Sequence, residues 1–552
     1  MNSNLLLNLV FIILIISIST LFFLFPFIKS KERITIKEYL KNNKNRLCVS
    51  ILFLIGFLSR IIFLDLLPGG INQDEASAGY DAYAIMKYGI DRNGFTYPVH
   101  LVSWGSGQNA LYSYLLIPFL FIFGNNEISL RLPMAIIGCL SLYLLYKLLN
   151  NKFDKKTAVI GLFFLTICPW HIMKSRWALE SNLFPDLVFF GVFFLINYLS
   201  NKKIYNLIIS SLILGISAYS YGTSYFFLFF FVIIILIYLV INKKIILKHA
   251  FLCLSIVGII CIPIILFLYI NLFDKESINI LCFSIPKLNV NRFQSVTNIY
   301  SSSFFESAKE NFKSGLYLLF NQNDNLPWNS IPYFGTIYLF SIPFTIIGVF
   351  HKNRNSKEFI WICRIWLIVS IAMLTIIKPN INRINIMLFP ILIFTILGLV
   401  DLFVLSKKYE KILLSLYTVS YLLFISYYST TWNEKLKTNF FYGLKEAILL
   451  TENIDEKQEI YITSKVNMPY IFVLYYTEYN VNDYIESVEY YNEGSDFEKV
   501  KSFSNYNFYL PATLDDGNVY IVSTYDNIYN NIDLTDYNVT YFGNYYVIDT
   551  TL

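Results

Sequence analysis

The stretch GINQDEASAGYDAYAI (residues 70–85) decides how the rest of the chain is interpreted, because it places three carboxylates in an otherwise apolar sequence. Asp74 and Glu75 follow directly on an apolar run that we expect to span a membrane. Ionisable groups beside a bilayer are costly, so two adjacent acids there point to a functional site. The alternative is a solvated loop start, or a helix N-cap with acids in its first turn.

The composition indicates a polytopic membrane protein. Of its 552 residues, 56% are hydrophobic and only 15% are charged. Apolar runs of roughly 17–25 residues, the length that an α-helix needs to cross a bilayer, recur along the chain. We predict twelve membrane-spanning helices, at about residues 5–28, 47–66, 128–149, 157–172, 184–200, 204–221, 223–241, 246–271, 331–350, 359–377, 384–404 and 412–429. The stretch ALYSYLLIPFLFIFG (110–124) is apolar but short, and we expect a juxtamembrane or re-entrant helix there.

Lysine and arginine gather in short loops between these runs, which predicts the orientation of the spans. Six such loops cover residues 29–46, 147–156, 201–203, 242–248, 351–357 and 406–411. Positively charged loops face the cytoplasm, and with twelve spans all six fall on that side. The acidic stretch and the C-terminal region are therefore expected on the extracytoplasmic face of the cell membrane.

Four segments on the predicted outer face are long enough to carry a site: residues 67–127, 174–186, 272–330 and the tail 430–552. The tail is rich in Asn, Asp and Tyr, and it has short β-type runs at residues 459–464, 470–476, 518–524 and 544–550. We predict a membrane domain over residues 1–429 and a small extracytoplasmic α/β domain over residues 430–552.

Charged residues of both signs recur in the predicted outer turns. Arg176 and Glu180 stand four residues apart, on one face if their segment is helical. The turn KPNINRIN (378–385) holds Lys378 and Arg383, although cations are unusual in so short an outer turn. The alternative for Arg383 is a side chain that snorkels to the membrane interface. Acids and bases on one face predict a site that binds a phosphorylated lipid and activates a hydroxyl.

Five segments in order carry a resemblance to a known family. They are GINQDEASAGYDAYAIMKYGIDRNG, LYSYLLIPFLFIFGNNEISLRLPMAIIG, PWHIMKSRWALESNLFP, YSYGTSYFF and NINRIN. They resemble the bacterial relatives of protein O-mannosyltransferases and aminoarabinose lipid A transferases, the family 39 glycosyltransferases of the GT-C fold. The resemblance covers about residues 47–405, and the acidic pair matches the family's DE motif. It is specific for the family and says little about the substrate.

The resemblance implies transfer of a sugar from a polyprenyl-phosphate donor to an acceptor hydroxyl on the outer face, with inversion. Asp74 would take the proton of the acceptor, and Glu75 would orient the acceptor or shape the environment of Asp74. An aspartate with a pKa near ~3.9 is a weak base, but a neighbouring carboxylate and desolvation raise that pKa. Glu180 is the third catalytic candidate.

The departing lipid phosphate needs positive charge as its bond to the sugar breaks. The candidates for this role are Arg383, Lys378, Arg176 and Arg131, with the alternative that Arg131 ties the first outer loop to the helices. The candidates for substrate binding are His171, Tyr80, His100 and Tyr221. Histidine and tyrosine also occur at membrane interfaces without a ligand, which is the alternative for these residues.

No cofactor and no metal are implied. The seven cysteines form no CxxC or Cys/His metal spacing. Asp74 and Glu75 could in principle hold a divalent cation, as carboxylates do in oligosaccharyltransferases.

The partners implied are a polyprenyl-phosphate-linked sugar, an acceptor hydroxyl on a protein, glycan or lipid, and the lipid bilayer, with no nucleic acid. The alternative functions are a flippase or transporter, and a polymerase or ligase, of lipid-linked glycans; no internal repeat favours the transporter.

Overall fold

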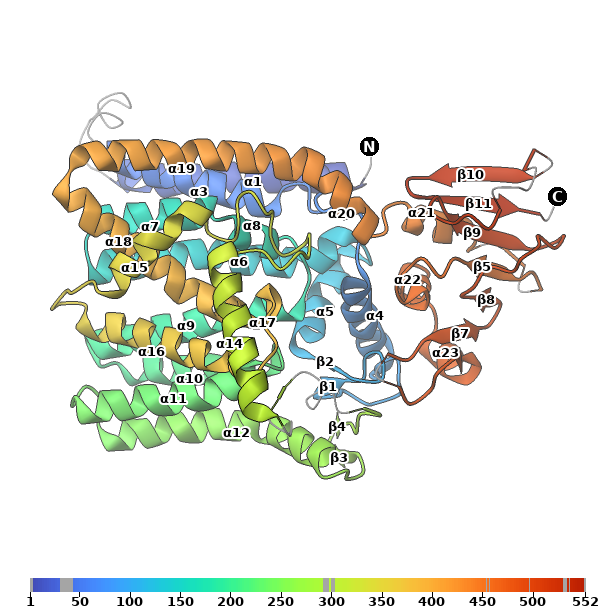
Figure 1. The fold of residues 1–552 in the computed structure, drawn as a ribbon, viewed down its shortest axis with the longest axis horizontal. Helices are drawn as coiled ribbons and strands as arrows, with labels where there is room; N and C mark the ends of the chain where they lie inside the picture. Colours follow the sequence, from blue (N-terminus) through green and yellow to red (C-terminus); the bar gives the residue numbers. More distant parts are fainter. Residues whose placement is uncertain are drawn as a thin grey trace.

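A computed structural model describes residues 3–29, 43–290, 297–298, 303–452, 454–455, 457–495, 497–529, 534–535 and 537–550. Long helices lie side by side in the larger part of the molecule, and a β-sheet formed by the C-terminal residues lies at one end of them (Figure 1). The molecule is thus a helical bundle with a second, sheet-containing part at one end.

The bundle is made of thirteen principal helices among the described residues. They are α1 (Ser3–Lys29), α3 (Lys44–Ile61), α6 (Glu127–Lys152), α7 (Lys155–Ile167), α8 (Pro169–Lys174), α9 (Glu180–Asn201), α10 (Ile204–Ile216), α11 (Ser224–Ile241), α12 (Leu247–Leu272), α15 (Ile342–Val349), α16 (Lys357–Met373), α18 (Leu388–Leu405) and α19 (Lys407–Tyr427). Every one of the twelve predicted runs overlaps one of these helices. Within the described residues, seven helices are long and apolar enough to cross a membrane, or eight if the bent pair α7–α8 counts as one span. The prediction of a polytopic helical protein is confirmed, and the count of twelve spans stays a prediction.

The predicted span 157–172 is broken in the middle. Helices α7 and α8 meet at an angle of 58°. Cys168 between them is extended, with φ −65° and ψ 116°. The cause is local, because a residue before a proline is pushed out of the helical region, and Pro169 follows.

The predicted span 331–350 is helical only in its second half. A 3₁₀ turn, η2, covers Leu339–Ser341 and leads into α15. Before it, Gly335 and Tyr338 have φ of 69° and 65°, values that a right-handed helix excludes. The prediction of a helix from residue 331 is therefore wrong.

The lysine-rich loops gather at one end of the bundle. Their contacts join Lys156 to Glu410 at 2.7 Å, the Lys202 ammonium to the Lys244 carbonyl at 2.6 Å, Lys244 to Glu358, and Ser356 to the Lys152 carbonyl. Five of the six predicted cytoplasmic loops are thus linked in a chain of contacts, in which Glu358 is the first residue after the loop 351–357. Most of the sixth loop, residues 29–46, lies outside the described residues. The sheet lies at the opposite end of the bundle (Figure 1).

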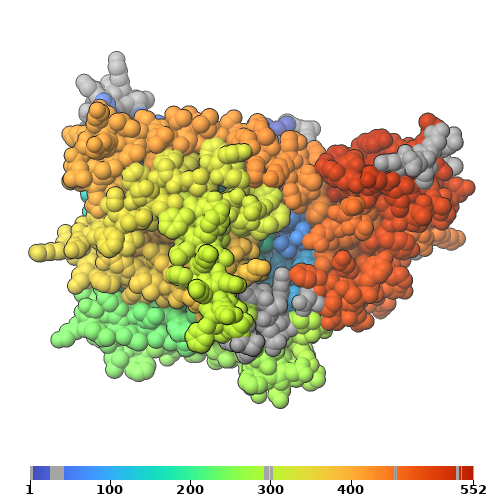
Figure 2. Space-filling view, viewed as in Figure 1, coloured from blue at the N-terminus to red at the C-terminus, as the bar shows by residue number. Residues whose placement is uncertain are grey.

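Shorter elements cover the end of the bundle that faces the sheet. They are α4 (Gln73–Tyr88), β1 (His100–Leu101), β2 (Gln108–Asn109), α5 (Leu111–Phe123), β3 (Ile278–Ile280), β4 (Phe283–Ile285), α14 (Phe304–Asn321) and α17 (Ile381–Ile384). Helix α5 is the predicted short apolar helix, and at 13 residues it rises only about 20 Å. Helix α14 lies across the others on the surface of the molecule (Figure 2).

The C-terminal part is a seven-stranded mixed sheet with helices. Its strands follow the order β10-β11-β9-β5-β8-β7-β6. Their bounds are β5 (Ile460–Ile462), β6 (Glu489–Tyr490), β7 (Val500–Phe503), β8 (Tyr506–Asn507), β9 (Val519–Ser523), β10 (Asn538–Phe542) and β11 (Tyr545–Asp549). The helices are α20 (Asn433–Asn439), α21 (Leu444–Leu450), α22 (Pro469–Tyr476) and α23 (Val481–Ser487).

One of the four predicted β-type runs is wrong, because residues 470–476 form helix α22. Pro469 occupies its first turn, a position that proline favours. The helix packs against α4, where a Cβ on Gly79 would lie 2.6 Å from the Tyr475 ring. An apolar run of this length suits a buried helix as well as a strand, so its periodicity could not decide.

Helix α4 begins with a complete capping box. The Asn72 side chain accepts a hydrogen bond from the Glu75 amide, and the Glu75 carboxylate accepts one from the Asn72 amide. The helix ends at Gly89, which has φ 76° as left-handed C-caps require. These caps fix the first acid of the DE pair in the second helical position and the second acid in the third.

The Glu75 carboxylate also forms a buried ion pair with Arg131 of α6. The guanidinium Nε lies 2.8 Å from one carboxylate oxygen, and Nη2 lies 2.9 Å from the other. The same guanidinium donates to the carbonyls of Leu64, Pro68 and Gly70, which link α3 to α4. Both side chains are fully buried, so the pair holds α4 against α3 and α6.

We expect Glu75→Ala to lower the free energy of unfolding by about 3–5 kcal/mol, because it leaves the Arg131 charge buried without its partner. Equilibrium unfolding in detergent micelles measures this change. Glu434→Ala is the matched control, since it removes an exposed partner of Lys437 and should cost no more than about 1 kcal/mol. An equal loss in the two variants would contradict the structural role of the Glu75–Arg131 pair.

Candidate active site

The two acids of the DE pair have different surroundings. Glu75 is fully buried, and besides Arg131 it accepts a hydrogen bond from the Ala178 amide at 3.1 Å. Asp74 is partly exposed in the first turn of α4. The expectation that Glu75 orients an acceptor is corrected to a structural role, because its carboxylate is buried and bonded to Arg131 and to two backbone amides. The expectation that it shapes the environment of Asp74 stays a prediction. Asp74 is the acid of the pair that solvent reaches.

The face of α4 that carries Asp74 also meets the loop between β1 and β2. Ser77, one helical turn after Asp74, donates to the Gln108 side chain at 2.9 Å and lies 3.0 Å from the Ser103 hydroxyl. Residues three apart share a helix face. Asp74 and Ser77 therefore lie on one side of α4, although Asp74 is not among the residues that line the cavity beside this pair of strands.

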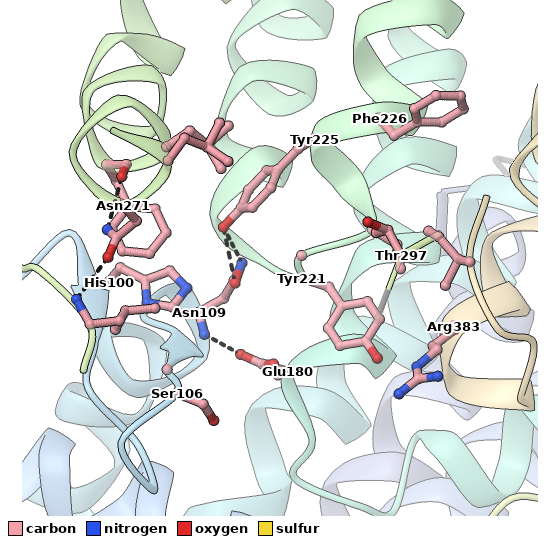
Figure 3. A pocket seen from close by; sticks show the side chains of 18 of the residues that line it. His100, Ser106, Asn109, Glu180, Tyr221, Tyr225, Phe226, Asn271, Thr297 and Arg383 are labelled. Carbon is pink, nitrogen blue, oxygen red and sulfur yellow. Dashed lines mark hydrogen bonds between the residues drawn. The ribbon is translucent and has the colours of Figure 1, made fainter. Parts of the chain in front are cut away.

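A cavity lies beside β1 and β2 (Figure 3), which are at the end of the bundle that faces the sheet (Figure 1). It encloses about 1110 Å³, including the space open to solvent at its mouth. Its walls come from the β1–β2 loop, the first residue of α9, the turn before α11, the end of α12, and the segment before and within α17. Polar lining residues are His100, Ser106, Asn109, Glu180, Tyr221, Thr223, Tyr225, Asn271, Thr297 and Arg383.

The structure brings four of the predicted site residues together in this cavity: Glu180, Arg383, His100 and Tyr221. Glu180 accepts a hydrogen bond from the backbone amide of Asn109. Arg383 uses one of its five donors to bind the Lys378 carbonyl at 2.9 Å. In Figure 3 the Tyr221 ring lies between the carboxylate and the guanidinium. The cavity wall therefore carries one carboxylate and one guanidinium.

Arg176 and Glu180 do not share a helix face. Helix α8 ends at Lys174 and α9 begins at Glu180, so the chain between them is not helical. The Arg176 guanidinium is buried and donates to the carbonyls of Ser59, Ile62, Phe63 and Leu67. It satisfies orphan carbonyls at the end of α3. The expectation that Arg176 binds a phosphate is therefore wrong.

Three other predicted residues also lie outside the cavity lining. Arg131 is held by Glu75 and backbone carbonyls, so the alternative that it ties the first outer loop to the helices is the correct one. The Tyr80 hydroxyl donates a hydrogen bond to the Tyr479 carbonyl at 2.8 Å. This bond joins α4 to the C-terminal part. The Lys378 side chain is exposed.

His171 lies inside the bundle instead of at a binding surface. Its Nδ1 lies 2.9 Å from Arg60 Nη2, and its Nε2 lies 3.5 Å from the Asp186 carboxylate. Asp186 also binds Lys174 and the Ser141 hydroxyl. All of these side chains are buried. The prediction that His171 binds substrate is wrong, because its ring is enclosed by this charged cluster.

His100 forms part of the cavity wall as a neutral ring. The ring stacks on Phe267 with a centroid distance of 4.1 Å and an interplanar angle of 13°. Burial lowers the pKa of His100 to about 4. Gly107 makes this stack possible, since its φ is +107° and a Cβ there would lie 2.7 Å from the imidazole.

Several residues that line the cavity were not predicted from the sequence. Asn109 holds Glu180 through its amide and exchanges hydrogen bonds at 3.2 Å with the Tyr225 hydroxyl. Asn271 accepts from the Leu288 amide at 2.7 Å. A usable signal was present, because each of these polar residues stands at the outer edge of an apolar run.

The described residues hold no group of three or more histidine, cysteine, aspartate or glutamate side chains that is placed to bind a metal ion. The charge available in the cavity comes instead from Arg383 and Glu180.

Residues 109–267 match the family model described as dolichyl-phosphate-mannose-protein mannosyltransferase. ArnT from Cupriavidus metallidurans bound to undecaprenyl phosphate is similar in structure, with a TM-score of 0.54, 11% identity, and coverage of 92% of this chain and 97% of ArnT. Its apo form gives a TM-score of 0.52, 11% identity, and coverage of 93% and 98%. No curated protein sequence matches this chain.

The archaeal oligosaccharyltransferase AglB from Archaeoglobus fulgidus, solved with an inhibitory peptide and a dolichol-phosphate, has a TM-score of 0.47 and 14% identity over 79% of this chain. This chain spans 64% of the length of that enzyme. The similarity to ArnT extends over nearly the whole of both chains and shows a common GT-C fold. The fold implied by the sequence resemblance is confirmed.

The burial of His100 predicts a loss of stability in acid. Its pKa is about 4 in the native protein and near ~6.5 in an unfolded chain, so the unfolded state binds more protons between these values. Stability should therefore fall as the pH drops from 6.5 to 4, and His100→Gln should reduce that fall. Thermal unfolding across this range measures it, with His249→Gln near the lysine-rich loops as the matched control. A pH dependence that His100→Gln leaves unchanged would refute the assignment.

Proposed function

We propose that this protein is a membrane glycosyltransferase that moves a sugar from a polyprenyl-phosphate donor to an acceptor hydroxyl on the outer face of the membrane, with inversion. The observation that carries the proposal is the cavity with Glu180 and Arg383 at the end of the bundle opposite the lysine-rich loops. The similarity to ArnT, which was solved with undecaprenyl phosphate, supports the choice of donor.

Arg383 is the proposed partner of the donor phosphate. A guanidinium matches two phosphate oxygens at once and stabilises the charge that develops as the lipid phosphate leaves. Apolar side chains share the cavity with it, among them Phe226, Ile376 and Ile377. Such a lining suits the start of a lipid chain. The proposal requires no metal ion, because the guanidinium supplies positive charge.

Asp74 is the proposed base, and Glu180 the proposed anchor for hydroxyl groups of the sugar or the acceptor. Asp74 is partly exposed and lies outside the cavity lining, one helical turn before Ser77, which binds Gln108 next to the lining residue Asn109. Glu180 lines the cavity directly. A carboxylate accepts hydrogen bonds from hydroxyls and carries no donor of its own when ionised.

The proposed orientation can be tested by labelling. Single cysteines introduced as Thr96→Cys, Glu486→Cys and Arg354→Cys, in a background without native cysteines, would be exposed to a membrane-impermeant thiol reagent in intact cells. We expect labelling at 96 and 486 and none at 354, because the first two lie at the sheet end and the third in a lysine-rich loop. Labelling of only one of the first two sites would contradict the topology.

The separate roles proposed for Asp74 and Arg383 can be tested by kinetics. Asp74→Asn should lower turnover by about 10²–10⁴-fold with donor binding nearly unchanged. Arg383→Ala should lower both turnover and donor affinity, and Arg383→Lys should recover only part, because the two-pronged contact is lost. Binding of undecaprenyl phosphate and sugar transfer are measured separately, with Lys313→Ala on α14 as the control for loss of a cation.

The results also separate the alternative functions. A flippase or transporter would keep its activity in Asp74→Asn, because no proton is taken from a hydroxyl. Loss of donor binding in Asp74→Asn, with normal turnover of the donor that remains bound, would show that Asp74 is not the base.

A further inference from the structure

The two charged groups of the cavity come from segments that are distant in sequence. Glu180 is the first residue of α9, and Arg383 lies in the four-residue helix α17. A cavity that holds a sugar phosphate between them needs a fixed separation, because reacting groups displaced by about 1 Å lose rate by around 10²-fold. Something must therefore join the start of α9 to the turn that carries Arg383.

Asn385 makes this connection. It begins η3 (Asn385–Met387), directly after α17, and its side-chain amide donates to the carbonyl of Ser181 at 2.8 Å. Ser181 follows Glu180, and Asn385 stands two residues after Arg383. Asn385 and Ser181 are buried, with exposures of 1% and 0%. One buried hydrogen bond thus joins the residue that follows Glu180 to the residue two positions after Arg383.

The sequence of α9 leaves this carbonyl open to Asn385. In a regular helix the carbonyl of residue 181 would accept from the amide of residue 185, but residue 185 is a proline and has no N–H. An unpaired buried carbonyl costs about 1–3 kcal/mol. The Asn385 amide supplies the hydrogen-bond donor that Pro185 lacks, so the bond is specific to this position.

The Arg383 turn is held independently on its other sides. The Trp366 indole donates to the Ile386 carbonyl at 2.8 Å, and the Asp324 carboxylate accepts from the Ile381 amide at 2.9 Å. Glu180 has its own anchor in the Asn109 amide. Each charged group therefore has local support that does not depend on Asn385, so we expect a change at Asn385 to act mainly on their relative placement.

We propose that Asn385 is a positioning residue that sets the separation of Glu180 and Arg383 by binding the carbonyl that Pro185 leaves free. The inference rests on the proposed glycosyl transfer and goes beyond it, since Asn385 lies outside the cavity lining. It acts on the step that uses both charged groups at once and leaves binding of the lipid phosphate to Arg383 intact.

Asn385→Ala tests the inference through the difference between turnover and binding. We expect kcat to fall about 10–100-fold while the affinity for undecaprenyl phosphate changes less than about threefold. Asn206→Ala is the matched control, because Asn206 is a buried asparagine whose amide donates to Asn201 at the lysine-rich end. The control should keep its kcat.

The double variant Asn385→Ala/Pro185→Ala separates positioning from simple loss of stability. Replacing the proline in this background restores a backbone N–H that can donate to the Ser181 carbonyl, so the melting temperature should recover toward the wild-type value while kcat stays low. Recovery of kcat together with the melting temperature would overturn the inference, as would a normal kcat in Asn385→Ala. Wild-type protein that transfers no sugar from any polyprenyl-phosphate donor would instead overturn the proposed function, and this inference with it.

Discussion

The buried ion pair between Glu75 and Arg131 is the constraint on which the end of the helical bundle beside the sheet depends. The guanidinium donates hydrogen bonds to three carbonyls of the segment between α3 and α4. The carboxylate accepts hydrogen bonds from one amide before α4 and one amide before α9. Removing two charges from water costs several kcal/mol for each ion, and these hydrogen bonds are what offset that cost. The pair thereby fixes α4 relative to α3, α6 and the start of α9, which are the elements that surround the candidate site.

This arrangement explains why two acids stand side by side. Successive residues on a helix point about 100° apart, so adjacent carboxylates cannot face the same surroundings. The capping box turns Glu75 inward toward Arg131, which leaves Asp74 at the surface of the same turn. One acid holds the helices together, and the other stays partly exposed at the surface of the turn. Glu180, from a different helix, supplies the carboxylate of the cavity itself.

The sequence predicted the apolar helices, the clustering of the lysine-rich loops and four residues of the cavity, because these follow from local hydropathy and charge. It could not predict which charges are satisfied inside the protein. Arg131, Arg176 and Lys378 looked alike in the sequence, as cations in predicted outer turns. Only the folded chain shows that Arg176 donates to carbonyls just after α3 and that Arg131 forms an ion pair with Glu75. The helix at residues 470–476 was missed for a related reason, since its apolar run fits two kinds of buried element and its partner α4 lies far away in sequence.

The packing of α22 onto α4 has a consequence for biosynthesis. The two helices share one hydrophobic core, in which residues around Ala76–Tyr83 meet residues around Tyr470–Tyr475. Nearly the entire membrane domain is translated between them, which takes tens of seconds at about 5–20 residues per second. During that interval α4 can pack against α5 and α6, but the side that meets α22 has no partner. Synthesis that stops before α22 therefore leaves this side of α4 without its packing partner.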